Sequence, residues 1–441
     1  MIRRLIAIAA IGLAAVPLTA QDAPPASIEA DAPALAPRGT LPVGTASLTL
    51  VAPERPDVLR PGPTGFPRGN RSLPIEIWYP AAAAGTQRTT YEMPRPDLGD
   101  NAPAGTVRFD GQATRDAASA KGRFPLVVLS HGFGNRAVMW SALAENLASK
   151  GYVVAAIEHG DVSAKEAGSP LTSFLSTVVH RAADQRFVID ELTRRAKSGQ
   201  GVFAHADAAK VALIGYSMGG FGALTTAGAG YDPNGGLFRQ VPGGLLDAAL
   251  EDRVTAPANL RALVAIAPWG GAAATRMWTS AALGKIAIPS LIIDGDHDDI
   301  VDYEGGVRWL FGAMTRSDRH LLIYRDARHN IGMNASPPAL RNDFRYRERY
   351  DEPVWRADRL LAVNAHFITA FLDSRIKGEA AAGRYLDVPT PIASDGDWPL
   401  AQGAQAGTST AGPPSYWPGF QRRWAMGLEL HRGPLTTRAK E

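Results

Sequence analysis

The sequence contains no cysteine among its 441 residues. This absence excludes disulfide bonds, a thiol nucleophile, a thiolate metal site and a lipid anchor on an acylated cysteine. A strong excess of one charge is also lacking, because the net charge is +3 and falls to +1 (3 − 2) without Arg3 and Arg4 of the N-terminal segment. We therefore expect no nucleic-acid partner and no attraction to an anionic surface.

Long apolar runs are absent too, apart from one near the N-terminus. There, two arginines precede an apolar run over residues 5–16, which is followed by Pro17 and ends on the small residue Ala20. This three-part layout is typical of a secretory signal peptide over residues 1–20, with cleavage near Ala20. It predicts a periplasmic or secreted protein with no stable membrane insertion after cleavage. The alternative is an N-terminal anchor that is retained after export.

The remaining composition, with 45% hydrophobic and 20% charged residues, is that of a globular protein. Residues 21–38 are rich in alanine and proline, which predicts a flexible linker. We expect residues 39–378 to form one domain. Residues 379–441 are expected to form a C-terminal extension packed on that domain, and the sequence assigns it no role.

Strand-like and helix-like segments alternate through the expected domain. A continuous apolar run, which is typical of a strand buried on both faces, occurs at residues 124–132. Further strand-like segments occur at residues 152–160, 210–217, 262–270, 289–296 and 320–329. Helical spacing of apolar residues occurs at residues 136–151, 180–197, 305–314 and 356–378. This alternation predicts an α/β fold with a mostly parallel central sheet and helices on both faces.

Ligands of an open parallel sheet bind at the carboxyl ends of its strands, so polar residues at those ends are candidates for a site. One strand runs into the motif GYSMG at residues 215–219, a G-x-S-x-G pattern. A nucleophile on a tight strand-to-helix turn needs small neighbours, which Gly215, Gly219 and Gly220 provide. We interpret Ser217 as a nucleophile; the alternative is a serine in an ordinary glycine-rich connection.

A serine hydroxyl needs a neighbouring base that a third group orients. The segment IIDGDHDDIV follows a predicted strand, and its G-x-x-D-x-x-V pattern favours Asp298 as that third group, with Asp296 and Asp299 as alternatives. A calcium loop is excluded, because an EF-hand needs glycine where Asp299 stands and glutamate where Gly305 stands. A solvated acidic loop remains the other interpretation.

His329 follows a later strand and gives the chain order serine, aspartate, histidine, so we expect it to be the base. His320 precedes the same strand and is expected at the opposite edge of the sheet. The backbone N–H groups of Met218 and Phe133 are the expected donors to a developing oxyanion. His131, on the same loop as Phe133, is interpreted as a brace for the turn rather than a second base.

On these motifs the sequence resembles the α/β-hydrolase superfamily, and more narrowly the bacterial predicted dienelactone hydrolase group related to platelet-activating-factor acetylhydrolases. The resemblance covers residues 73–378 and rests on LPIEIWYPA, FPLVVLSHGFG, LASKGYVVAAIEHGD, RAADQRFVIDEL, GYSMGGFGAL, GDHDDIV and FITAFLDSRIKG. It implies a serine hydrolase with the triad Ser217, Asp298 and His329, and with Phe133 and Met218 forming the oxyanion hole. True dienelactone hydrolases use a cysteine nucleophile, which this sequence lacks, so dienelactone is not the expected substrate.

We therefore expect a secreted serine esterase that hydrolyses small or lipid-like carboxylic esters, with short acyl groups preferred, and uses no metal or organic cofactor. Trp269, His131 and His159 are the predicted pocket residues. The predicted lid and pocket walls are the excursions at residues 81–122, 161–179, 229–260 and 330–355. Alternatives are a phospholipid or polyester hydrolase, a peptidase, or a hydrolase-fold binding module without activity. The oligomeric state is not predicted.

Overall fold

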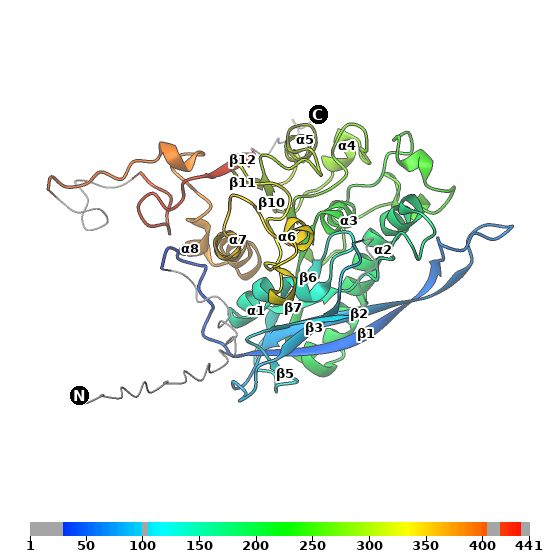
Figure 1. The fold of residues 1–441 in the computed structure, drawn as a ribbon, viewed down its shortest axis with the longest axis horizontal. Helices are drawn as coiled ribbons and strands as arrows, with labels where there is room; N and C mark the ends of the chain where they lie inside the picture. The colour runs from blue at the N-terminus through cyan, green and yellow to red at the C-terminus, as the bar shows by residue number, and fades with distance from the viewer. Residues whose placement is uncertain (1–29, 99–104, 404–414, 434–441) are drawn as a thin grey trace, which may run out of the picture.

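A computed structural model describes residues 30–98, 105–403 and 415–433 of the chain (Figure 1). The predicted signal peptide and the first half of the predicted linker lie outside these residues. Among the helices within these ranges, none is long and apolar enough to cross a membrane.

Ten strands form one sheet in the order β12-β11-β10-β9-β8-β6-β7-β2-β1-β5. Its six central strands, from β11 to β7, run parallel to one another. Strand β12 is antiparallel to β11, β2 is antiparallel to both β7 and β1, and β1 is parallel to β5. The sheet strands are β1 (Val43–Pro56), β2 (Arg68–Pro80), β5 (Thr114–Arg115), β6 (Phe124–Ser130), β7 (Val153–Ile157), β8 (Ala206–Tyr216), β9 (Leu260–Ile266), β10 (Ser290–Gly295), β11 (Arg319–Tyr324) and β12 (Leu428–Gly433). A separate two-stranded sheet pairs β3 (Thr90–Pro94) with β4 (Thr106–Asp110).

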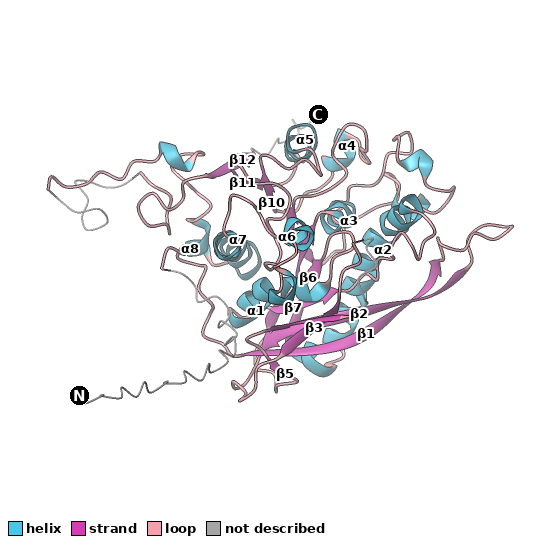
Figure 2. Ribbon diagram, in the orientation of Figure 1, coloured by secondary structure: helices cyan, strands magenta, loops and turns pink. Residues whose placement is uncertain are grey.

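Helices cover both faces of the large sheet (Figure 2). The α-helices are α1 (Ser141–Ser149), α2 (Pro170–Lys197), α3 (Met218–Thr226), α4 (Ser280–Leu283), α5 (Arg308–Ala313), α6 (Phe344–Tyr350), α7 (Ala357–Leu372) and α8 (Ala380–Gly383). This arrangement confirms the predicted α/β fold with a mostly parallel central sheet.

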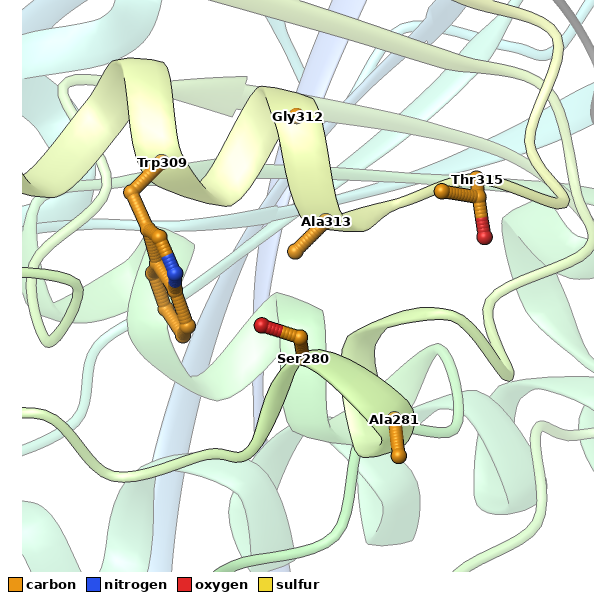
Figure 3. A pocket seen from close by; sticks show the side chains of 6 residues that line it. All are labelled: Ser280, Ala281, Trp309, Gly312, Ala313 and Thr315. Carbon is orange, nitrogen blue, oxygen red and sulfur yellow. The ribbon is translucent and has the colours of Figure 1, made fainter.

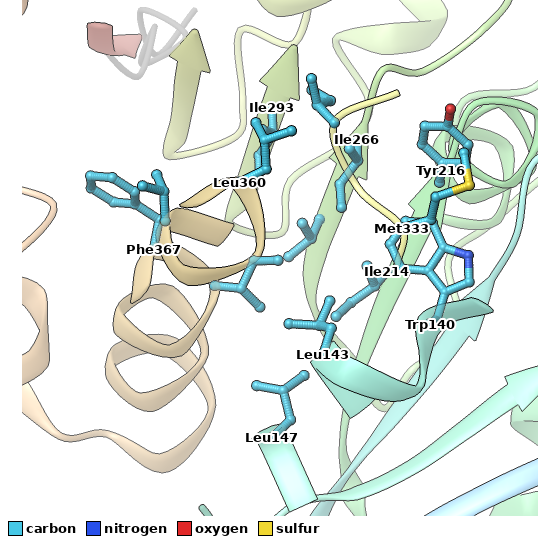
Figure 4. Close-up of a cluster of buried hydrophobic side chains, with 14 of the residues drawn as sticks. Trp140, Leu143, Leu147, Ile214, Tyr216, Ile266, Ile293, Met333, Leu360 and Phe367 are labelled. Atoms are coloured by element: carbon cyan, nitrogen blue, oxygen red, sulfur yellow. The ribbon is translucent and has the colours of Figure 1, made fainter. Parts of the chain in front are cut away.

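Successive residues of each central strand contribute to two different hydrophobic cores. In β6, Val127 and Leu129 belong to the core that contains α1 and α7 (Figure 4), whereas Leu126 and Val128 belong to the core that contains α2 and α3. Side chains alternate across a strand, so a strand covered on both faces must be apolar at every position. The continuous apolar runs in the sequence follow from this burial.

Helix α2 begins ten residues earlier than the sequence pattern predicted. The hydroxyl of Ser169 accepts a hydrogen bond from the Thr172 N–H at 3.0 Å, and Pro170 occupies the first helical position. The predicted start at residue 180 was therefore wrong, because this cap lies outside the apolar periodicity. Residues 170–179, about half of the excursion expected at residues 161–179, form the first ten residues of α2.

The second half of the predicted linker is bound to the domain. The Ala34 N–H donates to the Gly419 carbonyl at 2.8 Å, and the Leu35 N–H donates to Nδ1 of His366, on α7, at 3.0 Å. Ala36 is buried. The structure thus differs from the expected flexible linker over residues 30–38, because their backbone groups and apolar side chains have partners on the domain.

The C-terminal extension takes part in both the sheet and the core. Strand β12 pairs antiparallel with β11 at the edge of the sheet. Trp417 and Phe420 are buried, and the Phe420 ring contacts that of His366 at a centroid distance of 5.2 Å. The extension therefore completes the fold that positions the site.

Candidate active site

Ser217 occupies a strained turn between β8 and α3. Its backbone angles are φ 52° and ψ −114°, a region that residues with a side chain rarely adopt. A Cβ added at Gly219 would lie 2.0 Å from the Ser130 carbonyl oxygen, and one added at Gly215 would lie 2.3 Å from the Gly219 carbonyl oxygen. Helix α3 can therefore approach β6 this closely only with glycine at position 219.

The structure brings together the three side chains of the predicted triad. Nε2 of His329 lies 3.0 Å from the Ser217 hydroxyl, and Nδ1 of His329 lies 2.6 Å from Oδ2 of Asp298. Ser217 is 7% exposed and the side chain of His329 is 13% exposed, whereas that of Asp298 is fully buried. The hydroxyl therefore has a neighbouring base, and a buried carboxylate orients that base.

The carboxylate of Asp298 is held in its ionised form. Burial alone would raise its pKa, but the hydrogen bond to His329 and the N–H groups of Ile300 and Val301 hold the pKa below its ordinary value. The two alternative aspartates have other partners: Asp296 accepts from the Asp326 N–H, and Asp299 pairs with Arg328. Of the candidate acids, Asp298 is the one bonded to His329.

His320 lies away from this group, as expected for a residue at the start of β11. It is buried, and that burial lowers its pKa to about 4. It stands at the amino end of its strand, and His329 follows the carboxyl end of the same strand. The sheet topology therefore separates the two histidines.

The two residues predicted to supply oxyanion donors lie on segments that adjoin Ser217. Met218 opens α3, where the first backbone N–H groups of a helix have no partner within the helix. The loop after β6 passes against the serine, since a Cβ added at Gly132 would lie 3.1 Å from Cβ of Ser217. Phe133 follows on this loop, and its side chain is 42% exposed.

Three aromatic side chains form a wall beside Ser217. The backbone N–H of Trp269 donates to the Ser217 carbonyl at 3.2 Å, so Trp269 lies next to the serine. Its ring contacts Phe174 of α2 at a centroid distance of 5.1 Å, and Phe174 contacts Phe133 at 5.9 Å. The wall therefore runs from the β9 end to the loop after β6.

His131 and His159 do not line an accessible pocket, so the structure corrects their prediction as pocket residues. Their exposed fractions are 0% and 1%. Nε2 of His131 accepts from the His159 N–H at 3.2 Å, so its Nδ1 carries the proton donated to the Gly132 carbonyl at 2.7 Å. His131 thus braces the loop, as its alternative interpretation expected.

His159 belongs to a second serine–histidine–aspartate array that sequence reasoning missed. Its Nε2 lies 2.7 Å from the Ser130 hydroxyl and its Nδ1 lies 3.1 Å from Asp184, which is also paired with Arg71. Burial, together with the nearby charge of Arg181, lowers the pKa of His159 well below its ordinary value. The array is buried and cannot reach a substrate, so it ties β6, β7 and α2 together.

A pattern in the sequence could have revealed this buried polar layer. Arg181, Asp184, Val188 and Leu192 follow one stripe of α2 at helical spacing, and all four are buried. When charged residues stand at the positions where an apolar stripe would continue along a helix, they are expected to be buried. Buried charges need partners, so the pattern indicates a buried polar network.

Asp294 is a further buried acid near the triad, at the end of β10. It is fully buried. Burial raises its pKa well above the ordinary value, and the negative charge of Asp298 raises it further. The pKa values of these two neighbouring carboxyl groups are therefore shifted in opposite directions.

The structure also has depressions that the predicted site residues do not line. A depression of about 510 Å³ lies between α4 and α5 (Figure 3) and is lined by none of the predicted site residues. Its lining residues are Ser280, Ala281, Trp309, Gly312, Ala313 and Thr315. Across the described ranges, no group of three or more histidine, aspartate or glutamate side chains could hold a metal ion.

Part of the sequence matches a known family. Residues 101–198 match the family model described as platelet-activating factor acetylhydrolase, isoform II. A stretch of 42 residues is 52% identical to the platelet-activating factor acetylhydrolase of Canis lupus familiaris and 48% identical to that of Bos taurus. Each stretch covers 10% of this chain and 10% of the relative, so the chain spans about a tenth of the length of the curated relatives it matches.

The fold is similar to that of a ferulic acid esterase from Streptomyces cinnamoneus, with a TM-score of 0.52 and 23% sequence identity. That match covers 79% of this chain and 94% of the esterase chain. Together the comparisons confirm the predicted α/β-hydrolase fold and the predicted resemblance to the acetylhydrolase-like esterases. The family match contains the loop after β6 and ends before Ser217.

The raised pKa of Asp294 leads to a prediction about stability. Folding protonates Asp294 above about pH 4, so wild-type stability should fall with rising pH by up to about 1.4 kcal/mol per pH unit from this group. Asp294→Asn removes this proton uptake and should flatten the fall that begins at about pH 4. Urea unfolding at several pH values measures both slopes, and equal slopes for the two proteins would contradict the prediction.

Proposed function

We propose that this protein is a serine esterase that hydrolyses carboxylic esters through an acyl-enzyme. The observation that carries the proposal is the continuous chain of hydrogen bonds from Asp298 through His329 to the Ser217 hydroxyl. The sharp turn at Ser217 and the neighbouring N–H groups support it, and so does the similarity to acetylhydrolases and to an esterase fold.

In the proposed reaction, Ser217 attacks the acyl carbon while Nε2 of His329 accepts its proton. The backbone N–H groups of Phe133 and Met218 stabilise the oxyanion that forms. His329 then gives the proton to the leaving alkoxide, and Asp298 stabilises the imidazolium. Water activated by His329 attacks the acyl-enzyme, which releases the acid and restores Ser217.

The proposed substrates are small esters with short acyl groups. The backbone of Trp269 is bonded to Ser217, and the Trp269 ring continues into those of Phe174 and Phe133. We propose that this wall limits the length of the acyl chain. A lipid-like acetyl ester is the second candidate, because the family match is to platelet-activating factor acetylhydrolases. Both candidates share a short acyl group and differ in the alcohol.

Reaction with a fluorophosphonate tests the proposed nucleophile. Wild-type protein should be labelled once per chain, and Ser217→Ala should not be labelled, because the probe needs an activated serine. Ester turnover should fall at least about 10⁴-fold in Ser217→Ala and about 10³–10⁴-fold in Asp298→Asn. Mass spectrometry and initial rates measure these effects. Unlabelled, folded wild-type protein would favour a binding module without activity.

A panel of p-nitrophenyl esters tests the proposed acyl preference. Because the aromatic wall restricts the acyl side, kcat/KM for acetyl and butyryl esters should exceed that for the dodecanoyl ester at least about tenfold. Trp269→Ala should narrow this ratio, whereas Trp424→Ala, a change at an exposed tryptophan on the C-terminal extension, should leave it unchanged. A peptide amide and a phospholipid acetyl ester complete the panel. Faster turnover of the amide would contradict an esterase.

We also propose that the protein is exported, on the basis of its N-terminal sequence. Expression of the full chain in a bacterial host should give a periplasmic or extracellular protein whose mass corresponds to a chain beginning at Gln21. Intact-mass spectrometry of each cell fraction measures this. Recovery of the uncleaved chain in the membrane fraction would instead support a retained anchor.

A further inference from the structure

The loop after β6 passes against Ser217 at Gly132, and it carries the Phe133 N–H one residue later. The peptide groups on either side of Phe133 are each bonded to a side chain. The Gly132 carbonyl accepts from Nδ1 of His131 at 2.7 Å. The Gly134 N–H donates to Oδ2 of Asp161 at 2.9 Å. Since a peptide group is planar, the first bond sets the direction of the Phe133 N–H, and the second sets the direction of the peptide group that follows Phe133.

The second of these bonds depends on a charged group that the proposed mechanism does not use. Asp161 follows β7, and its side chain is 4% exposed. The oxygen that accepts from Gly134 also accepts from Nη2 of Arg181 at 2.7 Å, and the other oxygen accepts from the Thr177 hydroxyl at 3.2 Å. Arg181 is itself buried, so the pair is shielded from water.

The state of Asp161 makes this contact a strong one. Burial raises its pKa, but the charge of Arg181 outweighs this and holds the pKa below its ordinary value, so the group is a carboxylate. A carboxylate accepting from a backbone N–H forms a charge-assisted hydrogen bond, which is stronger than a neutral one. Gly134 has a φ of 63°. Glycine adopts positive and negative φ about equally readily, so this conformation needs a bond such as the one to Asp161 to hold it.

Stability alone does not account for this pair. A buried ion pair is often no more stabilising than an apolar pair of the same volume, because both ions lose their hydration. What Asp161 adds is a fixed acceptor at one point of the loop. Pre-organised donors stabilise an oxyanion best when they need no reorientation during the reaction.

We infer that Asp161, held by Arg181, is a positioning residue that orients the loop carrying the Phe133 N–H toward the oxyanion. This inference rests on the proposed esterase function. Asp161 touches the loop and not the substrate, so its effect is expected on the transition state more than on substrate binding.

Asp161→Asn keeps the shape of the side chain and removes its charge. The variant should lose about 10–100-fold in kcat while KM stays within about twofold, because the oxyanion donor is misplaced and the ground-state contacts remain. Affinity for an alkylboronic acid, whose tetrahedral adduct places an oxygen in the oxyanion position, should fall by a similar factor.

Glu145→Gln is the matched control. Glu145 is also a buried carboxylate, paired with Arg38 at 2.8 Å and accepting from the N–H groups of Gln112 and Ala113. It holds a loop at a different place and contacts neither Asp161 nor Gly134. Glu145→Gln should lower the melting temperature while kcat and boronate affinity remain as in the wild type.

The outcomes separate positioning from a structural role. If the folded Asp161→Asn variant has the kcat of the wild type, or only its KM rises, the inference is wrong. It is also wrong if Asp161→Asn and Glu145→Gln lose kcat by the same factor. If Asp161→Asn does not fold, Thr177→Val removes a milder contact with the same carboxylate and should lower kcat about 2–5-fold at unchanged KM. Unchanged kcat there would also overturn the inference. Wild-type protein inert toward both esters and fluorophosphonate would overturn the proposed function, and this inference with it.

Discussion

The site depends on how closely α3 approaches the end of β6. Gly219 lies so near the Ser130 carbonyl that any larger residue would collide with the backbone. Gln185 of α2 joins the same point, since its amide donates to the Ser130 hydroxyl at 2.8 Å and to the Gly219 carbonyl at 2.9 Å. This contact brings Ser217 and the loop at Phe133 together, so the nucleophile and its proposed oxyanion donors form one rigid unit.

Three acidic residues near this unit show how the local environment determines charge. Asp298 is ionised because His329 and two N–H groups outweigh its burial. Asp161 is ionised because the charge of Arg181 outweighs its burial. The pKa of Asp294 is raised instead, because it is fully buried and lies beside the negative charge of Asp298. The number of acids near the serine thus says little about the local field, which is set by their partners.

The sequence predicted the parts of the site that carry local signals. Ser217, Asp298 and His329 each follow an apolar strand, and a parallel sheet brings such strand ends to one edge. The structure places these three side chains in hydrogen-bond contact. The alternating strands and helices were predictable for the same reason, since burial on both faces leaves a continuous apolar run.

The remaining features depend on partners that are distant in the sequence. Burial of His131 and His159 could not be predicted, because it arises from α2 and β7 packing around them. The sequence around Leu35 does not indicate that the Leu35 N–H donates to His366. The edge strand β12 has no strong apolar run, and it is identified only by its pairing with β11. Such contacts are determined by tertiary packing and not by local pattern.

The pairing of β12 with β11 also bears on how the chain reaches its native state. Strand β11 ends at Tyr324 and β12 begins at Leu428, so a ribosome must release most of the chain before this edge can be covered. Until then, the backbone donors and acceptors of β11 are available to other chains. The bond from Ala34 to Gly419 likewise joins distant residues. The outer edge of the sheet is therefore covered late in folding. Until then, the incomplete chain can associate with other chains through this edge.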